Sequence, residues 1–257
     1  ANAAEWAQQK ATWMRALREK VFRGWPAEGE ALEIRALGGD FAHARRVDTY
    51  GFTSHQGVRL SLTIHKSYDL TLPKPKKLLL LVSDSLPFDD LDGTTIEKIY
   101  TGELAVAYFL PRGIGLTRSA LSAADQIEVR RRYMLLGQTV DSMRVWDIRR
   151  AVAALRSEEL FGDTPIMLVG YRDQAINALY ASLFIENIEN LRLFDAPASH
   201  ASSPDYLNVL RFLDIPQAAA MSAEHRPVTF YGLRSAEWSW TTQTAQRLGW
   251  PRERLSW

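Results

Sequence analysis

Apolar residues recur along this chain with two different periods, and the change between them predicts its elements. Over residues 5–22 they recur at helical spacing, which predicts an amphipathic N-terminal helix. Residues 46–55 and 58–66 instead alternate polar and apolar side chains, as half-buried strands do. The two residues between these runs suffice for a hairpin turn, so the sequence predicts an antiparallel strand pair.

Short continuous apolar runs follow, and each is separated from the next by a helical pattern. The runs cover residues 77–82, 104–110, 165–169, 191–194 and 227–231. The helical patterns cover residues 91–100, 123–157 with a break near Gly137, 174–184, 206–213, 216–223 and 240–248. Continuous apolar runs are typical of parallel strands buried on both faces. We therefore expect an α/β fold, with a mostly parallel sheet and helices on both faces. No repeat or linker interrupts the pattern, which predicts one domain over residues 1–257.

Three segments carry a resemblance to a known superfamily. They are the glycine loop Pro111-Arg112-Gly113-Ile114-Gly115, the helical stretch at residues 130–155, and the run at residues 195–211. Together they resemble α/β-hydrolases, in particular the divergent second half of tandem bacterial proteins of the acetyl xylan esterase-like and dienelactone hydrolase-like groups. The resemblance implies the α/β-hydrolase fold, opened by the antiparallel pair. It also implies a catalytic hydrolase domain as partner and carbohydrate esters, such as acetylated xylan, as substrate class.

The turn after residues 165–169 is where this fold carries its nucleophile, in a Gly-x-Ser-x-Gly motif. Here the turn reads Gly170-Tyr171-Arg172-Asp173-Gln174, with arginine at the nucleophile position and glutamine in place of the closing glycine. Arginine is protonated at physiological pH and cannot attack an ester. A carboxylate such as that of Asp173 can act as a nucleophile, but Asp173 lies one residue beyond the apex of the turn. We favour an Arg-Asp pair on a surface turn.

The general base of this fold is a histidine that follows the last strand. The chain has five histidines: His43, His55, His65, His200 and His225. None follows the run at residues 227–231, and His225, just before it, is expected at the opposite edge of the sheet. The serine and the histidine of the ordinary mechanism are therefore both missing, which predicts a degenerate nucleophile elbow.

A relocated catalytic site is the alternative. Asp195 ends a predicted strand, and His200, Ser202 and Ser203 follow it closely. Because the carboxyl ends of parallel strands face the usual crevice, an Asp-His-Ser cluster there could hydrolyse esters. The plainer interpretation is that Asp195 caps the loop and His200 holds it by hydrogen bonds. Likewise residues 83–85 occupy the oxyanion-loop region, or they cap a turn.

Composition limits the remaining chemistry. The absence of cysteine excludes disulfides and thiolate sites, and no close histidine pair suggests a metal ion. The loop with Gly113 and Gly115 has no third glycine, which a dinucleotide-binding fingerprint requires. We therefore expect no cofactor, and the lack of a histidine pair leads us to expect no metal. A formal net charge of +1 gives no field for nucleic acid or membranes, and no apolar run could span a bilayer. We expect a soluble protein; the composition does not decide whether it is exported to the periplasm or the cell exterior.

Tryptophans gather near the C-terminus, at Trp238, Trp240, Trp250 and Trp257. Aromatic faces stack on sugar rings, although such residues more often belong to a core or an interface. Three hypotheses result: a pseudo-esterase that supports a catalytic unit, an esterase with a relocated site, and a carbohydrate-binding module. The expected partners are a catalytic hydrolase domain, a second copy of the chain, or a carbohydrate ester.

Overall fold

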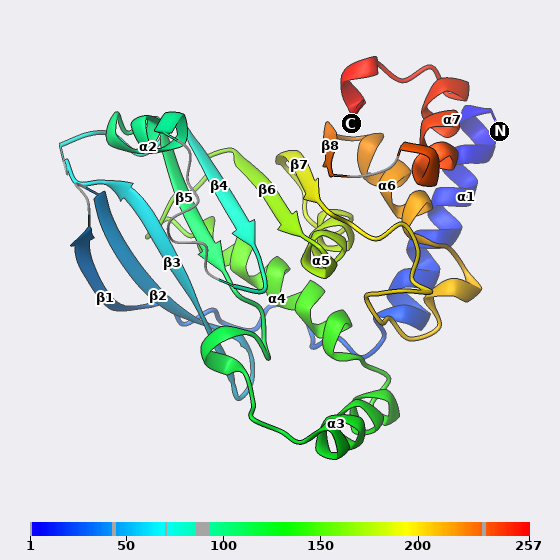
Figure 1. Ribbon diagram of the computed structural model, residues 1–257, viewed down its shortest axis with the longest axis horizontal. Coiled ribbons are helices and arrows are strands. Elements are labelled where there is room, and N and C mark those ends of the chain that lie inside the picture. The colour runs from blue at the N-terminus through cyan, green and yellow to red at the C-terminus, as the bar shows by residue number, and fades with distance from the viewer. Residues whose placement is uncertain (1, 43–44, 70, 86–92, 233–234) are drawn as a thin grey trace.

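The computed structural model describes residues 2–42, 45–69, 71–85, 93–232 and 235–257, and a mixed sheet runs through them (Figure 1). Its strand order is β1-β2-β3-β5-β4-β6-β7-β8-β9. The strands are β1 Arg35–Ala42, β2 Arg45–His55, β3 Val58–Ser67, β4 Lys77–Val82, β5 Leu104–Phe109, β6 Ile166–Tyr171, β7 Ile188–Phe194, β8 Val228–Tyr231 and β9 Leu255–Ser256. The pairs β1–β2, β2–β3 and β3–β5 are antiparallel, and every pair from β5 to β9 is parallel.

The expected hairpin and the expected parallel series are both confirmed, but the sheet is longer than predicted. Strand β1 extends the antiparallel part to three strands, although it contains Gly38 and Gly39 and lacks an alternating pattern. At the other edge, β9 adds a two-residue strand beside β8. Strand β1 is held by backbone pairing while its Leu37 and Phe41 stay exposed, and in β9 Leu255 also packs against the core.

Seven α-helices connect or flank the strands in the described ranges. They are α1 Ala3–Ala16, α2 Gly93–Tyr100, α3 Ala123–Leu135, α4 Val140–Leu155, α5 Asp173–Ser182, α6 Ile215–Ala223 and α7 Ser239–Arg247. A π-turn at Leu17–Val21 continues α1, whose start is capped by the reciprocal pair Asn2 and Glu5. The predicted break at Gly137, with φ +75°, separates α3 from α4.

One predicted helix is wrong. Residues 206–213 form only a short 3₁₀ turn, Val209–Arg211, because Asn208 has a left-handed backbone with φ +63° and interrupts the helix. The helix predicted over residues 91–100 corresponds to α2, which begins at Gly93. Residues 91–92 lie outside the described residues.

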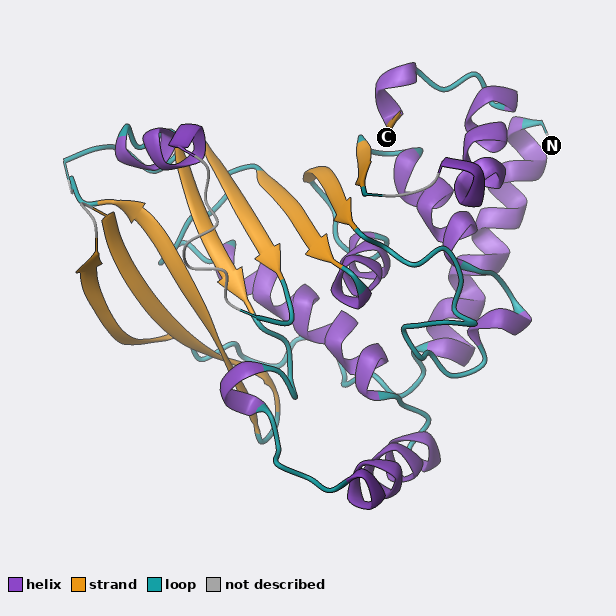
Figure 2. Ribbon diagram, in the orientation of Figure 1, coloured by secondary structure: helices purple, strands orange, loops and turns teal. Residues whose placement is uncertain are grey.

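The two faces of the sheet are covered unequally (Figure 2). On one face α5 and α6 pack over the parallel strands and α4 packs beside α5 and against β2, and most of the core lies there. On the other face α2 packs near β3 and β5 over a small cluster that includes Leu81, Val106 and Tyr108. Helix α3 projects from the body and buries none of its residues (Figure 1). No helix in the described ranges is long and apolar enough to cross a membrane.

Candidate functional site

The turn between β6 and α5 has the strained backbone of a nucleophile elbow. Arg172 stands at its apex with φ +52° and ψ −124°, a conformation that costs a residue with a Cβ about 1–3 kcal/mol. A Cβ at Gly170 would lie 2.5 Å from Ala175 Cα, so only glycine allows this close packing of strand and helix. The sharp strand-turn-helix geometry is therefore present, and a guanidinium replaces the hydroxyl at its apex.

Gln174, at the position of the closing glycine, links the elbow to the loop after β4. Its Nε2 donates to Asp84 Oδ1 at 3.0 Å, and its Oε1 accepts from Asn177 Nδ2 at 2.9 Å. The Asn177 Oδ1 in turn accepts a 2.6 Å hydrogen bond from the Tyr206 hydroxyl. This chain of hydrogen bonds, partly buried at Asp84 and buried at Asn177, joins the elbow helix both to the expected oxyanion loop and to the 199–206 segment.

In the loop after β4 the neighbouring serines bond locally. Ser83 is buried, and its Oγ accepts a 3.4 Å hydrogen bond from the backbone N–H of Ser85. That contact is typical of a capped turn. Asp173, the other residue weighed as a nucleophile, is the first residue of α5.

His200 is a buried residue whose two ring nitrogens are both engaged. Nδ1 lies 2.9 Å from the Pro204 carbonyl oxygen and Nε2 lies 2.9 Å from the Tyr180 hydroxyl. Its backbone N–H donates to Asp214 Oδ1 at 2.8 Å, and Ser199 Oγ donates to Oδ2 of the same carboxylate at 2.6 Å. Burial lowers the pKa of His200, because desolvation disfavours the imidazolium. These contacts anchor the 199–206 loop to α5.

No hydrogen bond joins Asp195, His200 and Ser202 to one another in the described part of the chain. Ser202 is exposed, and its backbone N–H donates to Ser199 O at 3.1 Å. Asp195 has φ +48°, and its carboxylate occupies the space that a Cβ at Gly232 would fill. The hydrogen bonds that these three described residues make all run to other groups.

The other histidines lie away from the elbow. His225 Nε2 lies 3.3 Å from Lys10 Nζ, near the amino end of β8, as expected. His55 Nδ1 lies 3.2 Å from Arg112 Nη2, and the His65 ring packs edge-on against Tyr108 with centroids 5.0 Å apart. His43 is outside the described residues. Within the described ranges no group of His, Asp and Glu side chains could hold a metal ion.

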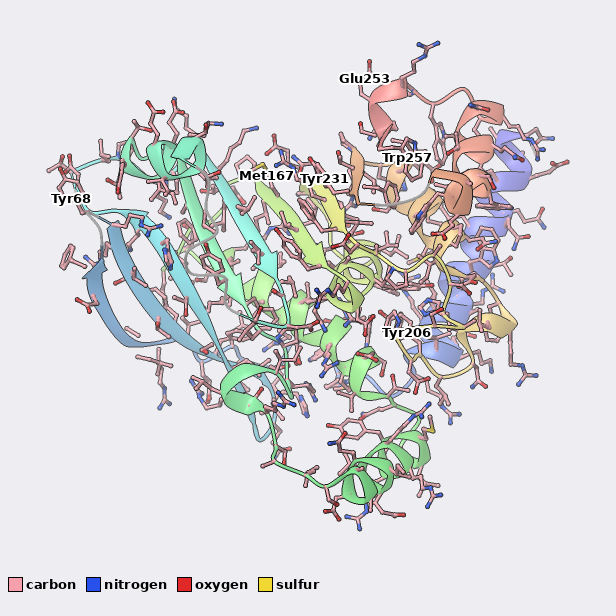
Figure 3. All side chains as sticks on the ribbon, in the orientation of Figure 1. Tyr68, Met167, Tyr206, Tyr231, Glu253 and Trp257 are labelled. Atoms are coloured by element: carbon pink, nitrogen blue, oxygen red, sulfur yellow. The ribbon has the colours of Figure 1, made fainter. Side chains whose placement is uncertain are left out.

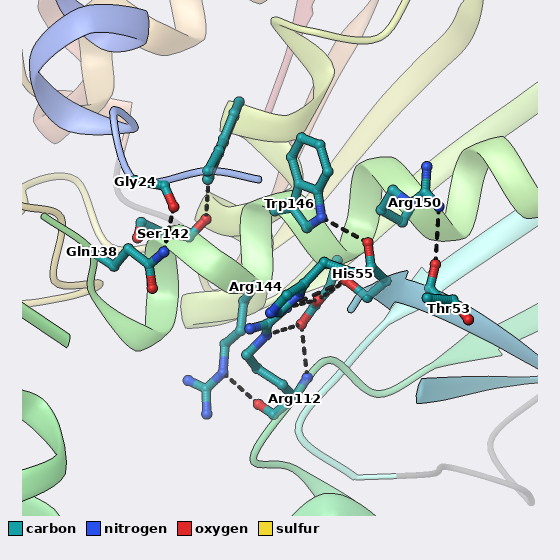
Figure 4. Close-up of polar contacts among 12 residues, drawn as sticks. Gly24, Thr53, His55, Arg112, Gln138, Ser142, Arg144, Trp146 and Arg150 are labelled. Carbon is teal, nitrogen blue, oxygen red and sulfur yellow. Dashed lines mark hydrogen bonds and ion pairs between the residues drawn. The ribbon is translucent and has the colours of Figure 1, made fainter. Parts of the chain in front are cut away.

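A buried ion pair supports the glycine loop after β5 (Figure 4). Asp147 on α4 has no exposed surface, and it accepts from Arg112 Nε at 2.8 Å and from Arg112 Nη2 at 2.6 Å. Ser54 Oγ, at the end of β2, donates to the same carboxylate at 2.6 Å. The pKa of Arg112 is raised: burial alone would lower it, but the hydrogen bonds and charge of Asp147 outweigh desolvation. Sequence patterns gave no sign of this pair.

A groove of about 740 Å³ opens on the less covered face of the sheet, along β4, β6 and β7. Arg172, Ser83, Asp84 and Asp195 line its end at the carboxyl edge of the sheet, where open α/β sheets bind ligands. Three aromatic rings stack across neighbouring strands beside it, with Tyr171–Phe194 centroids 4.6 Å apart and Phe194–Tyr231 centroids 4.2 Å apart. Tyr231, labelled in Figure 3, belongs to β8 and stacks on Phe194 of β7.

The C-terminal tryptophans pack mostly against other aromatic residues. Trp238 is fully buried, and Trp257 stacks on Phe230 with centroids 4.5 Å apart (Figure 3). Trp240 meets Trp13 edge-on at 6.1 Å. These ring contacts join the C-terminal segment to β8 and α1, while Trp240 and Trp257 remain 37% and 47% exposed.

This arrangement has solved counterparts. A Bacteroides fragilis protein regarded as an acetyl xylan esterase superposes with a TM-score of 0.77 at 10% identity, over 100% of this chain and 75% of that chain. The chain has the α/β-hydrolase fold. A promiscuous esterase of carbohydrate esterase family 15, from a marine bacterial metagenome, gives a TM-score of 0.63 at 12% identity, over 96% of this chain and 79% of that one.

An acetyl xylan esterase from Paenibacillus sp. R4 gives a TM-score of 0.59 at 13% identity, over 99% of this chain and 87% of that one. At these identities the likeness concerns the fold. No family model and no curated protein matches the sequence.

Proposed function

We propose that this domain is a catalytically degenerate α/β-hydrolase, a pseudo-esterase, that supports a catalytic unit resembling an acetyl xylan esterase. One observation carries the proposal: an arginine occupies the apex of an otherwise well-formed elbow, at φ +52°. The strained turn exists in hydrolases to present a nucleophile. A guanidinium presented there holds its proton and has no electron pair to form an acyl-enzyme.

Two further features support the loss of hydrolytic chemistry. Gln174 takes the place of a small elbow residue, and its side-chain amide donates a hydrogen bond to Asp84 in the neighbouring loop. His200, the histidine weighed for a relocated site, is bonded to Pro204 and Tyr180. Each group is used to hold the fold, and none is paired with a serine hydroxyl as a nucleophile must be.

The supporting role is drawn from the resemblance to the second half of tandem esterase-like proteins and from the esterase folds of the neighbours. The carbohydrate-ester class of substrate belongs in this view to the catalytic unit.

A fluorophosphonate probe, which labels activated serines, tests the loss of the nucleophile. The domain is compared with an active acetyl xylan esterase as positive control, and we expect no labelling above a heat-denatured sample. Labelling that disappears in Ser202→Ala or Ser83→Ala would overturn the proposal. The supporting role is tested by titrating the domain into that esterase and following kcat/KM on acetylated xylan. We expect a saturable change, and no change at any concentration would contradict support.

A further inference from the structure

Helix α3 is an element that the rest of the domain leaves uncovered. It projects from the body (Figure 1), and none of its 13 residues is buried. Residues 115–128 are all exposed, so the segment that leads into the helix is uncovered as well. On its inner side Arg130 pairs with Asp205 at 2.8 Å, and Val129 and Tyr133 are half-buried. One face of α3 therefore meets the body, and the opposite face points to solvent.

The outward face of α3 carries apolar side chains. Residues three or four apart share one face of a helix, and the face away from the body holds a row made of Ala124, Ile127, Arg131 and Leu135. Ile127 is 54% exposed and Leu135 is 86% exposed. A surface helix normally turns polar residues to solvent, and apolar side chains that gather there mark an interaction surface.

The charges of α3 are divided between its two halves. Its acidic residues, Asp125 and Glu128, lie in the first half, and its basic residues, Arg130, Arg131 and Arg132, lie in the second. A purely acidic or purely basic partner would suit only one half. A second copy of the same helix, running in the opposite direction, suits both, because the acidic half of each copy then meets the basic half of the other.

Antiparallel packing about a twofold axis near the middle of the helix also gives a definite register. It places each Glu128 opposite the partner's Arg131 and each Ala124 opposite the partner's Leu135. A small residue opposite a large one lets the two helix surfaces interdigitate. Within one chain Glu128 and Arg131 already pair at 2.9 Å, but both are more than half exposed, and a pair of this kind is cheaply exchanged for one between chains.

We propose that α3 is a dimerisation helix, through which two copies of this chain pack antiparallel about a twofold axis along the row that contains Ile127 and Leu135. At about 1.5 Å per residue the 13-residue helix is about 20 Å long, so the interface is small. Interfaces of this size are typical of weak complexes, and we expect a Kd in the micromolar range. Dimerisation through α3 requires no loss of the nucleophile, so the inference stands apart from the pseudo-esterase proposal.

Sedimentation equilibrium of the whole chain over a range of micromolar concentrations tests the dimer. We expect a reversible monomer–dimer equilibrium that Ile127→Asp abolishes. Leu210→Asp is the matched control, because Leu210 is also 54% exposed but lies outside α3, and it should leave the Kd unchanged. Circular dichroism should show both variants folded, since α3 buries none of its residues. A chain that stays monomeric throughout, or a dimer that persists in Ile127→Asp, would overturn the proposal and leave this face to a different protein.

Charge exchange tests the antiparallel register. Glu128→Arg sets like charges against the partner's Arg131, and Arg131→Glu sets like charges against the partner's Glu128, so each variant alone should associate about ten-fold more weakly. Both variants also lose the Glu128–Arg131 pair within the chain. An equimolar mixture restores the attraction between chains but not the pair within either chain, and we expect it to form heterodimers. A mixture that associates no better than either variant alone would contradict the antiparallel arrangement.

Discussion

Replacing Asp147 by asparagine should be among the most destabilising single changes in this chain. Its carboxylate is fully buried and accepts four hydrogen bonds: three from Arg112, including one from its backbone N–H at 3.0 Å, and one from Ser54. Asparagine keeps one acceptor oxygen and turns an NH₂ group towards donors. It also removes the charge that neutralises the buried Arg112 guanidinium.

The magnitude follows from the burial of both partners. The Arg112 side chain is 9% exposed and the Asp147 side chain 0% exposed, so little water can replace the lost carboxylate. Removing one member of a buried ion pair costs about 3–5 kcal/mol. Since a domain is stable by about 5–15 kcal/mol in total, Asp147→Asn should lose a large share of its free energy of unfolding.

Urea unfolding followed by tryptophan fluorescence measures this loss, and Asp48→Asn is the matched control. Asp48 is also a buried carboxylate, but its partners Arg46 and Lys66 remain 33% and 31% exposed. Those cations stay hydrated after the change, so we expect a loss of about 1 kcal/mol. Equal losses in the two variants, or a loss below about 1 kcal/mol for Asp147→Asn, would refute the reasoning from burial.

Three further predictions concern backbone strain, pH and the role of His200. Arg172→Gly should raise the free energy of unfolding by about 1 kcal/mol relative to Arg172→Ala, because glycine relieves the strain at φ +52°; equal stabilities in urea would contradict this. Burial lowers the pKa of His65 to about 4, below its unfolded value of 6.5. Between these two pH values the unfolded chain binds a proton at His65 that the folded chain does not bind, so the free energy of unfolding is highest above pH 6.5 and falls towards pH 4. His65→Leu should flatten that acid limb by roughly 1 kcal/mol per pH unit in urea titrations at several pH values, and an unchanged slope would contradict it. His200→Ala should cost about 1–3 kcal/mol by leaving the Tyr180 hydroxyl unsatisfied, whereas Ser202→Ala should be neutral; equal effects in thermal unfolding would oppose a structural role.

The parallel half of the fold was predictable because its strands are short apolar runs buried on both faces, as β4 and β5 are. Strand β1 was not, since two adjacent glycines and a single pair of large apolar residues give no alternating signal. Its conformation is set by antiparallel backbone pairing with β2, which begins at Arg45, and not by an apolar pattern of its own. The same limit applies to the segment at residues 206–213, where one left-handed residue, Asn208, decides against a helix.

At the site, the sequence located the elbow and the arginine at its apex. It could not show that Gln174 bonds to Asp84, 90 residues earlier, or that Tyr180 and Pro204 engage His200. Such partners are brought together only by the folded sheet. Arg192 did leave a signal: a charged residue between the buried Leu191 and Leu193 indicates a strand with one face outside the core, and Arg192 lines the groove on that face.

The most direct test of a degenerate site is the rate of 4-nitrophenyl acetate hydrolysis by the purified chain, measured beside Ser202→Ala, Ser203→Ala and His200→Ala. An arginine at the elbow apex and a histidine engaged by Pro204 and Tyr180 predict a rate equal to that of denatured protein. A rate above this blank that His200→Ala abolishes, in a variant still folded by circular dichroism, would contradict the degenerate site and would place catalysis in the 199–206 loop.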